Sequence, residues 1–303
     1  MRVLILGAGG VGGYIGSKLW NAAHQVTFLA RGDHLDAMQE RGLRLESPEG
    51  TIVARGTFTD TVEGLAPFDL IVVCVKSHDT RGSAEMCERV AHAKTIVLTI
   101  QNGVENTDIL GNVFGPEKVL GGIALIFSTI EAPGTIRHHG GTTKFKTGEF
   151  DGSSSERCTG LATTFRDAGI DVEIVPDIRR VLWQKFIFIC GLGGMTAYAR
   201  TTVGAILADT QHYAMLQEVV HEAAQVGRLS GIDPFNGIEG KADAHYRRLE
   251  PENTSSMFYD LMHGKQIEVE ALNGAVVRFS KKFGVSSPAN EKIYNALLPF
   301  AKR

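Results

Sequence analysis

Two charged residues stand in strongly apolar stretches of the sequence. Lys185 lies within Val-Leu-Trp-Gln-Lys-Phe-Ile-Phe-Ile, and Glu268 lies within Gln-Ile-Glu-Val-Glu-Ala-Leu. A charge in such surroundings is costly unless it has a partner or a use. The two can form a structural ion pair. Alternatively, Lys185 supplies a proton to a carbonyl oxygen and Glu268 holds the developing alcohol while a cofactor delivers hydride. Desolvation would lower the pKa of Lys185 toward neutrality, which suits an acid at cellular pH.

A glycine-rich segment near the N-terminus predicts a dinucleotide site. It follows an apolar strand at residues 2–6 and fits the pattern G-x-G-x-x-G. We expect Gly7 to allow the tight turn, Gly9 to let the backbone approach a pyrophosphate, and Gly12 to let the next helix pack closely on the strand.

The helix after this turn is predicted from about Gly10 to Ala22. Its first N–H groups and the positive end of its dipole would face the phosphates, so Gly10 and Val11 join the expected cofactor-binding residues.

Arg31 indicates which dinucleotide is favoured. It ends the second apolar strand, residues 25–30, where an NAD-preferring site usually carries Asp or Glu. The planar guanidinium suits a 2′-phosphate, although a solvated surface arginine is the alternative. We therefore expect NADP rather than NAD.

The composition is that of a globular chain with two cores. The 303 residues are 43% hydrophobic, enough for two domains. A net charge of −3 gives no broad basic field, so neither nucleic acid nor a membrane surface is an expected partner. The four scattered cysteines favour reduced thiols in the cytoplasm and no metal site. The apolar stretch 186–199 is too short to cross a bilayer and reads as a buried helix.

Alternating strand and helix patterns predict a Rossmann-type α/β domain over residues 1–176. Buried strands at 69–75 and 95–100 end at Lys76 and Asn102, and ligands gather at the carboxyl ends of parallel strands. A strand-end lysine with a solvated head and an Asn-Gly turn are the alternative interpretations. A helix at 78–91 is expected between these strands. Residues 119–127 and 135–150 are expected to form the antiparallel edge of the sheet.

Helical spacing dominates from Asp177 onward, which predicts an all-α domain over residues 177–303. The expected helices cover 181–198, 213–230, 256–262 and 267–283. Apolar helices after Tyr213 leave room for a homodimer.

The chain resembles the ketopantoate reductases (2-dehydropantoate 2-reductases), which reduce ketopantoate to pantoate with NADPH in pantothenate biosynthesis. The resemblance runs through the glycine turn, Arg31, Val75-Lys76, Gln101-Asn-Gly103, Leu182-Trp-Gln-Lys185, Glu252-Asn-Thr-Ser-Ser-Met257, Ile267-Glu268, Asn273-Gly274 and Gly284-Val-Ser-Ser-Pro288. It implies a Rossmann domain joined to a helical domain like that of 6-phosphogluconate dehydrogenase.

The resemblance also implies a role for each matched residue. Lys185 would be the general acid, and Glu268 would bind the substrate hydroxyl or carbonyl. Asn102 would lie between nicotinamide and substrate. The remaining implied contacts are Asn253 and Ser256 on the substrate carboxylate, and Lys76 and Arg31 on the cofactor.

Ser256 and Glu268 would lie about 18 Å apart on one continuous helix. We therefore expect the chain to break at His263-Gly264.

Two positions depart from the family pattern. Asparagines often follow the catalytic lysine at one-turn and two-turn spacing, but this chain has Ile189 and Gly193 there. Both share a helix face with Lys185, so the substrate region becomes more apolar or roomier. Ketopantoate is the leading substrate, and a bulkier or more apolar 2-keto acid is the alternative. A non-catalytic NADP-binding regulator is the alternative of another class, because a fold alone does not establish chemistry.

Overall fold

A computed structural model describes residues 1–233 and 236–301, and it divides the chain into two compact units. We call them the Rossmann unit, residues 1–101 and 106–178, and the helical unit, residues 102–105 with the chain from Arg179 onward. The short segment 102–105 therefore groups with the helical unit, although its neighbours on both sides belong to the Rossmann unit.

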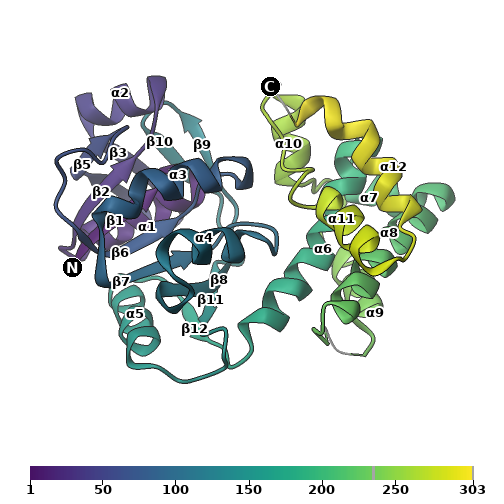
Figure 1. Cartoon of the computed structure of the whole chain (residues 1–303). Coiled ribbons are helices and arrows are strands. Elements are labelled where there is room, and N and C mark those ends of the chain that lie inside the picture. The colour runs from purple at the N-terminus through teal and green to yellow at the C-terminus, as the bar shows by residue number, and fades with distance from the viewer. Residues whose placement is uncertain (234–235, 302–303) are drawn as a thin grey trace. The chain divides into compact units, whose positions relative to one another are not determined.

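The Rossmann unit alternates strands with helices (Figure 1). Its strands are β1 (Arg2–Leu6), β2 (Gln25–Leu29), β3 (Leu43–Ser47), β4 (Gly50–Ala54), β5 (Thr57–Thr59), β6 (Phe68–Val73), β7 (Ala91–Thr99), β8 (Val119–Leu125), β9 (Ser128–Ala132), β10 (Thr135–His138), β11 (Lys144–Gly148) and β12 (Val172–Ile174). Its helices are α1 (Gly10–Asn21), α2 (Gly32–Arg41), α3 (Thr80–Cys87), α4 (Asn106–Phe114) and α5 (Glu156–Asp167), with 3₁₀ turns at Ser77–Asp79, Glu88–Val90 and Pro116–Lys118.

The main sheet has the order β12-β11-β8-β7-β6-β1-β2-β5. Strand β1 pairs in parallel with β2 on one side and β6 on the other, so the chain reverses its direction of winding there. Such a switch point is where open α/β sheets bind ligands. Alternate residues of β1 serve two cores: Val3 and Ile5 pack with α1 and α5, whereas Leu4 and Leu6 pack with α3 and α4.

The prediction of an antiparallel edge at 119–127 and 135–150 was partly wrong. Strand β8 is parallel to β7, and β11 pairs antiparallel with β8, but β9 and β10 leave this sheet. They join β3 and β4 in a second, four-stranded sheet of order β4-β3-β10-β9. Helix α1 contacts all four of these strands. Strand patterns do not identify pairing partners that are distant in the sequence, because pairing is set by the packed faces.

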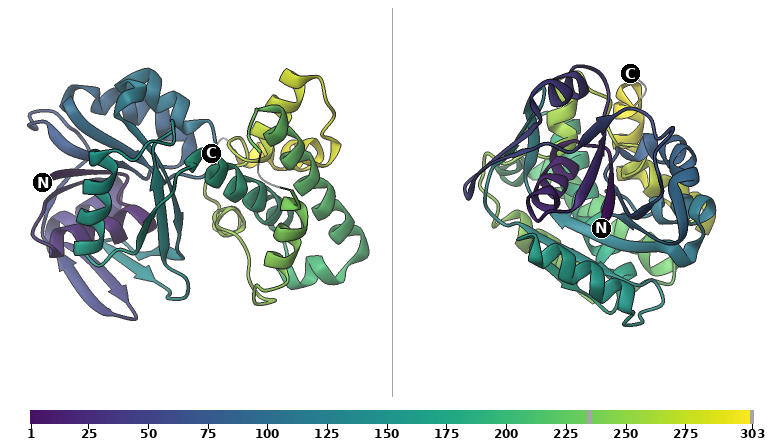
Figure 2. Two further views of the ribbon diagram at one scale, coloured as in Figure 1. Left: turned by 90° about the horizontal axis from the view of Figure 1, so that it is seen from below. Right: turned by 90° about the vertical axis from the view of Figure 1, so that its left-hand side faces the viewer.

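The described part of the helical unit is built from helices and turns (Figure 2). They are α6 (Ile178–Ala199), α7 (Val203–Ala208), α8 (Thr210–Leu229), α9 (Ile238–Tyr246), α10 (Ser256–Met262), α11 (Asn273–Phe283), α12 (Pro288–Leu297) and a 3₁₀ turn at Leu298–Phe300. Helix α8 contacts α7, α9, α11 and α12 around one apolar core. The predicted Rossmann-plus-helical fold class is confirmed.

Two predicted helix boundaries were wrong. Residues 267–268 are irregular and 269–272 form turns, with the N–H of Ala271 donating to the carbonyl of Glu268, so α11 starts only at Asn273. The helix predicted at 78–91 is α3 with a 3₁₀ turn at each end, and β7 begins already at Ala91. No helix among the described residues is long and apolar enough to cross a membrane.

Candidate active site

The glycine turn between β1 and α1 packs closely against the protein at two of its three motif glycines. Gly7 has φ +100°, and a Cβ there would lie 2.8 Å from the backbone nitrogen of Val75. A Cβ on Gly12 would overlap the carbonyl oxygen of Gly7. At Gly9, the N-cap of α1, a Cβ would meet no atom within 4 Å. The turn is therefore closed on its protein side and open at Gly9, where a dinucleotide backbone would approach.

Gly10 has an additional packing role that the sequence did not reveal. A Cβ there would overlap the carbonyl oxygen of Ser128 in β9, and the Ser128 hydroxyl donates to the Gly10 carbonyl at 3.0 Å. Val11 packs against the core shared by α1 and the main sheet. No acidic side chain stands in the first turn of α1. The backbone N–H groups of this turn lack acceptors within the helix, as at any helix start, and can bind an anion.

His34 supports the glycine turn from α2. Its Nε2 lies 3.0 Å from the carbonyl of Ala8, and its Nδ1 accepts the N–H of Gly134 at 3.0 Å. Burial lowers the pKa of His34, and the bond to Ala8 opposes this. The two bonds together define a neutral ring that donates from Nε2. Sequence reasoning missed this residue because Gly134 is a hundred positions away.

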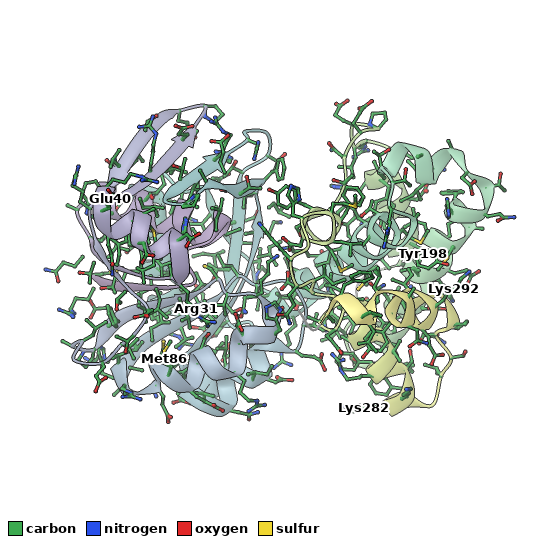
Figure 3. All side chains as sticks on the ribbon, turned by 90° about the horizontal axis from the view of Figure 1, so that it is seen from above. Arg31, Glu40, Met86, Tyr198, Lys282 and Lys292 are labelled. Atoms are coloured by element: carbon green, nitrogen blue, oxygen red, sulfur yellow. The ribbon has the colours of Figure 1, made fainter. Side chains whose placement is uncertain are left out.

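Arg31 lies at the end of β2 and is the N-cap residue of α2 (Figure 3). Its side chain is 69% exposed, and its guanidinium lies 3.9 Å from the Asp79 carboxylate. The long separation and the exposure describe a loose surface pair. A cation held in this way is available to a phosphate group.

Lys76 and Asn102 follow two neighbouring strands of the main sheet. Strands β6 and β7 pair in parallel, with Val73 opposite Thr99, and each residue stands three positions beyond this pair. Sequence reasoning placed each residue at the carboxyl end of a parallel strand, and the structure adds that the two strands are neighbours.

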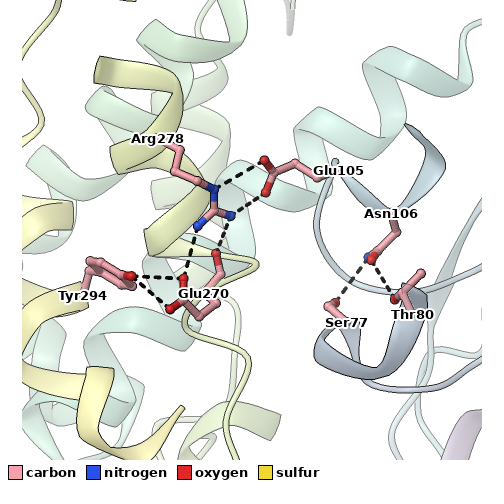
Figure 4. Close-up of polar contacts among 7 residues, drawn as sticks. All are labelled: Ser77, Thr80, Glu105, Asn106, Glu270, Arg278 and Tyr294. Atoms are coloured by element: carbon pink, nitrogen blue, oxygen red, sulfur yellow. Dashed lines mark hydrogen bonds and ion pairs between the residues drawn. The ribbon is translucent and has the colours of Figure 1, made fainter. Parts of the chain in front are cut away.

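A buried polar network lies beside these strand ends and was not predicted. The Gln101 amide donates to the Val75 carbonyl at 2.8 Å and to the Thr80 hydroxyl at 2.7 Å. Thr80 donates to the Asn106 carboxamide oxygen at 2.9 Å, and the Asn106 amide donates to the Ser77 hydroxyl at 3.2 Å (Figure 4). The network fixes both residues that flank segment 102–105. No local pattern signals it, because its members come from three separate stretches of sequence.

The structure brings Lys185 and Glu268 close enough to interact electrostatically within the helical unit. Lys185 comes from α6, and the largely buried Glu268 comes from the irregular segment before α11. Burial lowers the pKa of Lys185 to about 8, and the charge of Glu268 acts in the opposite direction. Desolvation thus outweighs the ion pair, which leaves an ammonium group able to release a proton near neutral pH.

The face of α6 that carries Lys185 continues through Ile189, Gly193 and Thr196 at helical spacing. Ile189 is partly buried against the apolar core of the unit. A Cβ at Gly193 would lie 3.4 Å from Met257 and 3.6 Å from Leu272, which are ordinary contact distances. The side-chain neighbours of Gly193 are therefore apolar, and a small side chain fits there.

Gly191 and Gly194, which lie near Gly193 on α6, have no space for a Cβ. A Cβ at Gly191 would overlap the hydroxyl of Tyr246, which donates to the Phe188 carbonyl at 2.8 Å. A Cβ at Gly194 would lie 2.7 Å from the buried amide of Asn273. Close packing therefore requires glycine at both positions.

Asn253 and Ser256, the predicted carboxylate ligands, are both exposed near the start of α10. The hydroxyl that reaches α6 is that of Ser255, which lies 2.8 Å from the Thr196 hydroxyl and also accepts the N–H of Phe258 as the N-cap. The predicted break after α10 is confirmed: the helix ends at Met262, and Gly264 has φ +66°.

Two family models match the chain. "Ketopantoate reductase PanE/ApbA" matches residues 3–152, and "Ketopantoate reductase PanE/ApbA C terminal" matches residues 177–300. The 2-dehydropantoate 2-reductase of Halobacterium salinarum is 31% identical over 290 residues, which are 95% of each chain.

Solved structures share the fold over nearly the whole length. A PanE/ApbA family ketopantoate reductase from Ralstonia eutropha matches with a TM-score of 0.92 and 29% identity, covering 99% of this chain and 98% of the other. D-mandelate dehydrogenase, solved with NADH and anilino(oxo)acetate, matches with a TM-score of 0.91 and the same coverages. Its 19% identity shows a likeness of fold alone. The chain therefore belongs to the ketopantoate reductase family, and it is an oxidoreductase of the kind that reduces 2-keto acids with a nicotinamide dinucleotide.

Proposed function

We propose that the protein reduces ketopantoate to pantoate with NADPH, with Lys185 as the proton donor. The observation that carries the proposal is the half-buried Lys185 in the apolar surroundings of α6, whose pKa of about 8 is set by desolvation against the charge of Glu268. A general acid works best when its pKa is near the operating pH.

The reaction adds a hydride to the carbonyl carbon and a proton to the carbonyl oxygen. The bound dinucleotide supplies the hydride to the carbonyl carbon of the keto acid. Lys185 Nζ donates a proton to the carbonyl oxygen as the C=O bond becomes a single bond, and the neutral amine then takes a proton from solvent. Glu268 accepts a hydrogen bond from the new hydroxyl and holds it near the lysine. Asn102, Asn253 and Ser256 orient the substrate.

NADPH is the proposed cofactor because of the residue at the end of β2. Arg31 is exposed and loosely paired there, where a ribose-binding carboxylate would favour NAD. The glycine turn would hold the pyrophosphate through Gly7, Gly9, Gly10, Val11 and Gly12, and Lys76 would add a further cofactor contact.

A bulkier or more apolar 2-keto acid is the second candidate substrate. Ile189 is partly buried in the core, and Gly193 faces Met257 and Leu272. Hydrophobic contact with such a surface favours an apolar acyl group over a hydroxylated one.

Steady-state NADPH oxidation with a panel of 2-keto acids tests the proposal. A preference for ketopantoate supports the assignment and a role in pantothenate biosynthesis. A preference for the bulkier acids keeps the reductase chemistry and changes the substrate. NADPH binding without turnover of any of these acids would refute the proposed reaction. The same preparation, run on a sizing column, tests for a homodimer.

A further inference from the structure

Segment 102–105 is short, and side-chain contacts hold it to the helical unit. Gly103 has φ +92°, so the chain turns sharply just after Asn102. Val104 packs against the apolar core of the unit. Glu105 then forms an ion pair with Arg278 of α11, with 2.5 Å between Nη2 and Oε2. The Nε of Arg278 also donates to the Oε1 of Glu105 at 3.5 Å, so the ion pair is bidentate.

The same guanidinium binds a second segment of the unit. Arg278 donates to the Glu270 carboxylate at 3.2 Å and to the Glu270 backbone carbonyl at 2.8 Å (Figure 4). The Tyr294 hydroxyl of α12 lies 3.0 Å from both oxygens of that carboxylate and donates to it. Glu270 stands two residues after Glu268. One side chain therefore joins the segment of Asn102 to the segment of Glu268.

The charges in this cluster are arranged to keep Arg278 bound. Partial burial acts to lower the pKa of Arg278, but the hydrogen bond and charge of Glu105 and the charge of Glu270 outweigh it, so the pKa is raised. A guanidinium is the cation that fits such a site, because its planar fork can serve two carboxylates at once. A lysine ammonium is a single point charge and could not hold the Glu105 and Glu270 carboxylates with the same geometry.

We propose that Arg278 is a positioning residue that holds the segment carrying Asn102 against the segment carrying Glu268. It thereby sets the separation of two side chains that contact the 2-keto acid. The proposal rests on the function proposed above, because the contacts of Asn102 and Glu268 with the keto acid are part of that function. In this proposal Arg278 acts only through these two segments. Misplacement of reacting groups by about 1 Å can cost roughly 100-fold in rate, so a distant anchor has a measurable effect.

The test compares R278Q with R228Q in the full-length protein. Arg228 is a matched control: it is 42% exposed against 46% for Arg278, and it pairs with Glu239 at 2.6 Å in the same unit. We expect R278Q to lower kcat for the preferred keto acid roughly 10- to 100-fold. We also expect its Kd for NADPH to stay within about twofold of wild type, because the glycine turn and Arg31 are untouched. R228Q should retain wild-type kinetics, and equal kinetics in R278Q and R228Q would overturn the proposal.

E105Q provides a second variant that leaves α11 intact. If Arg278 acts through Glu105, the loss in the R278Q/E105Q double variant is smaller than the product of the two single losses. Losses that multiply would contradict the proposal.

R278K should recover only part of the kcat lost in R278Q, because it restores the charge without the fork. Full recovery of kcat in R278K would show that a positive charge alone suffices, and it would contradict an anchor that depends on the guanidinium binding two carboxylates.

Hydrogen exchange separates this proposal from the proposed function. Amides of segment 102–105 should exchange faster in R278Q than in wild type or R228Q, whether or not the wild-type protein turns over any keto acid. Unchanged exchange in an active enzyme refutes the anchor. Faster exchange in a protein without turnover supports the anchor and refutes the proposed function.

Discussion

The proposed role of Lys185 as proton donor predicts an alkaline limit to catalysis, and the pH of that limit follows from the desolvation of the lysine. With a pKa of about 8, the lysine is about 90% protonated at pH 7 and about 10% protonated at pH 9. A proton donor must carry its proton, so kcat/KM for the keto acid should be flat below about pH 7. It should fall about tenfold per pH unit above about pH 8. We call this fall in kcat/KM the alkaline limb. With an ordinary exposed lysine as proton donor, the alkaline limb would lie at about pH 10.4.

Glu268→Gln tests the cause of the shift. The Glu268 charge raises the pKa of Lys185 against desolvation, so its removal should lower that pKa and move the alkaline limb to lower pH. The assay is the initial rate of NADPH oxidation from pH 6 to about pH 10.5, with reduced cofactor saturating. In parallel, Lys185→Ala should lose roughly 100-fold or more of the turnover at pH 7. A limb near pH 10 in wild type, or a limb that moves to higher pH in Glu268→Gln, would refute the reasoning.

Three further predictions concern cofactor and substrate. Arg31→Ala should weaken NADPH roughly 10- to 100-fold and NADH little, measured as Kd by fluorescence; equal losses would rule out a 2′-phosphate contact. Gly9→Ala should weaken NADPH without changing the free energy of unfolding, because its Cβ enters open space, whereas Gly12→Ala should also destabilise the fold by about 1–3 kcal/mol in urea titrations. An unaffected Kd in Gly9→Ala would argue against pyrophosphate there. Ile189→Asn with Gly193→Asn should raise kcat/KM for ketopantoate roughly tenfold if the amides bind substrate; an unchanged value would make both positions neutral.

Local patterns were enough to predict the strand, turn and helix of the expected dinucleotide site. The apolar run of β1 and the spacing of Gly7, Gly9 and Gly12 are properties of adjacent residues, and the structure shows the packing that each glycine permits. The desolvated Lys185 was predictable for the same reason, because its apolar neighbours in sequence are also neighbours on α6.

Features that depend on distant residues were not predictable. The second sheet pairs β3 with β10, about ninety residues apart, and no pattern within either strand specifies the other. The apolar spacing at 267–272 resembles a helix, but hydrogen bonds of Ala271 and Gly274 to earlier carbonyls form turns there. The contact of Ser255 with Thr196 was also hidden, since two adjacent serines look alike until one becomes the N-cap.

The unequal space around the glycines of α6 has a consequence for how this enzyme can change over evolution. Gly191 and Gly194 are fixed by Tyr246 and Asn273, whereas Gly193 has room for a Cβ on the face of the proposed proton donor. Genetic drift can therefore place a small side chain at 193 with little loss of folding stability. If the proposed substrate contact at this position holds, a directed-evolution library built on this one codon will change the acyl preference while Gly191 and Gly194 stay invariant.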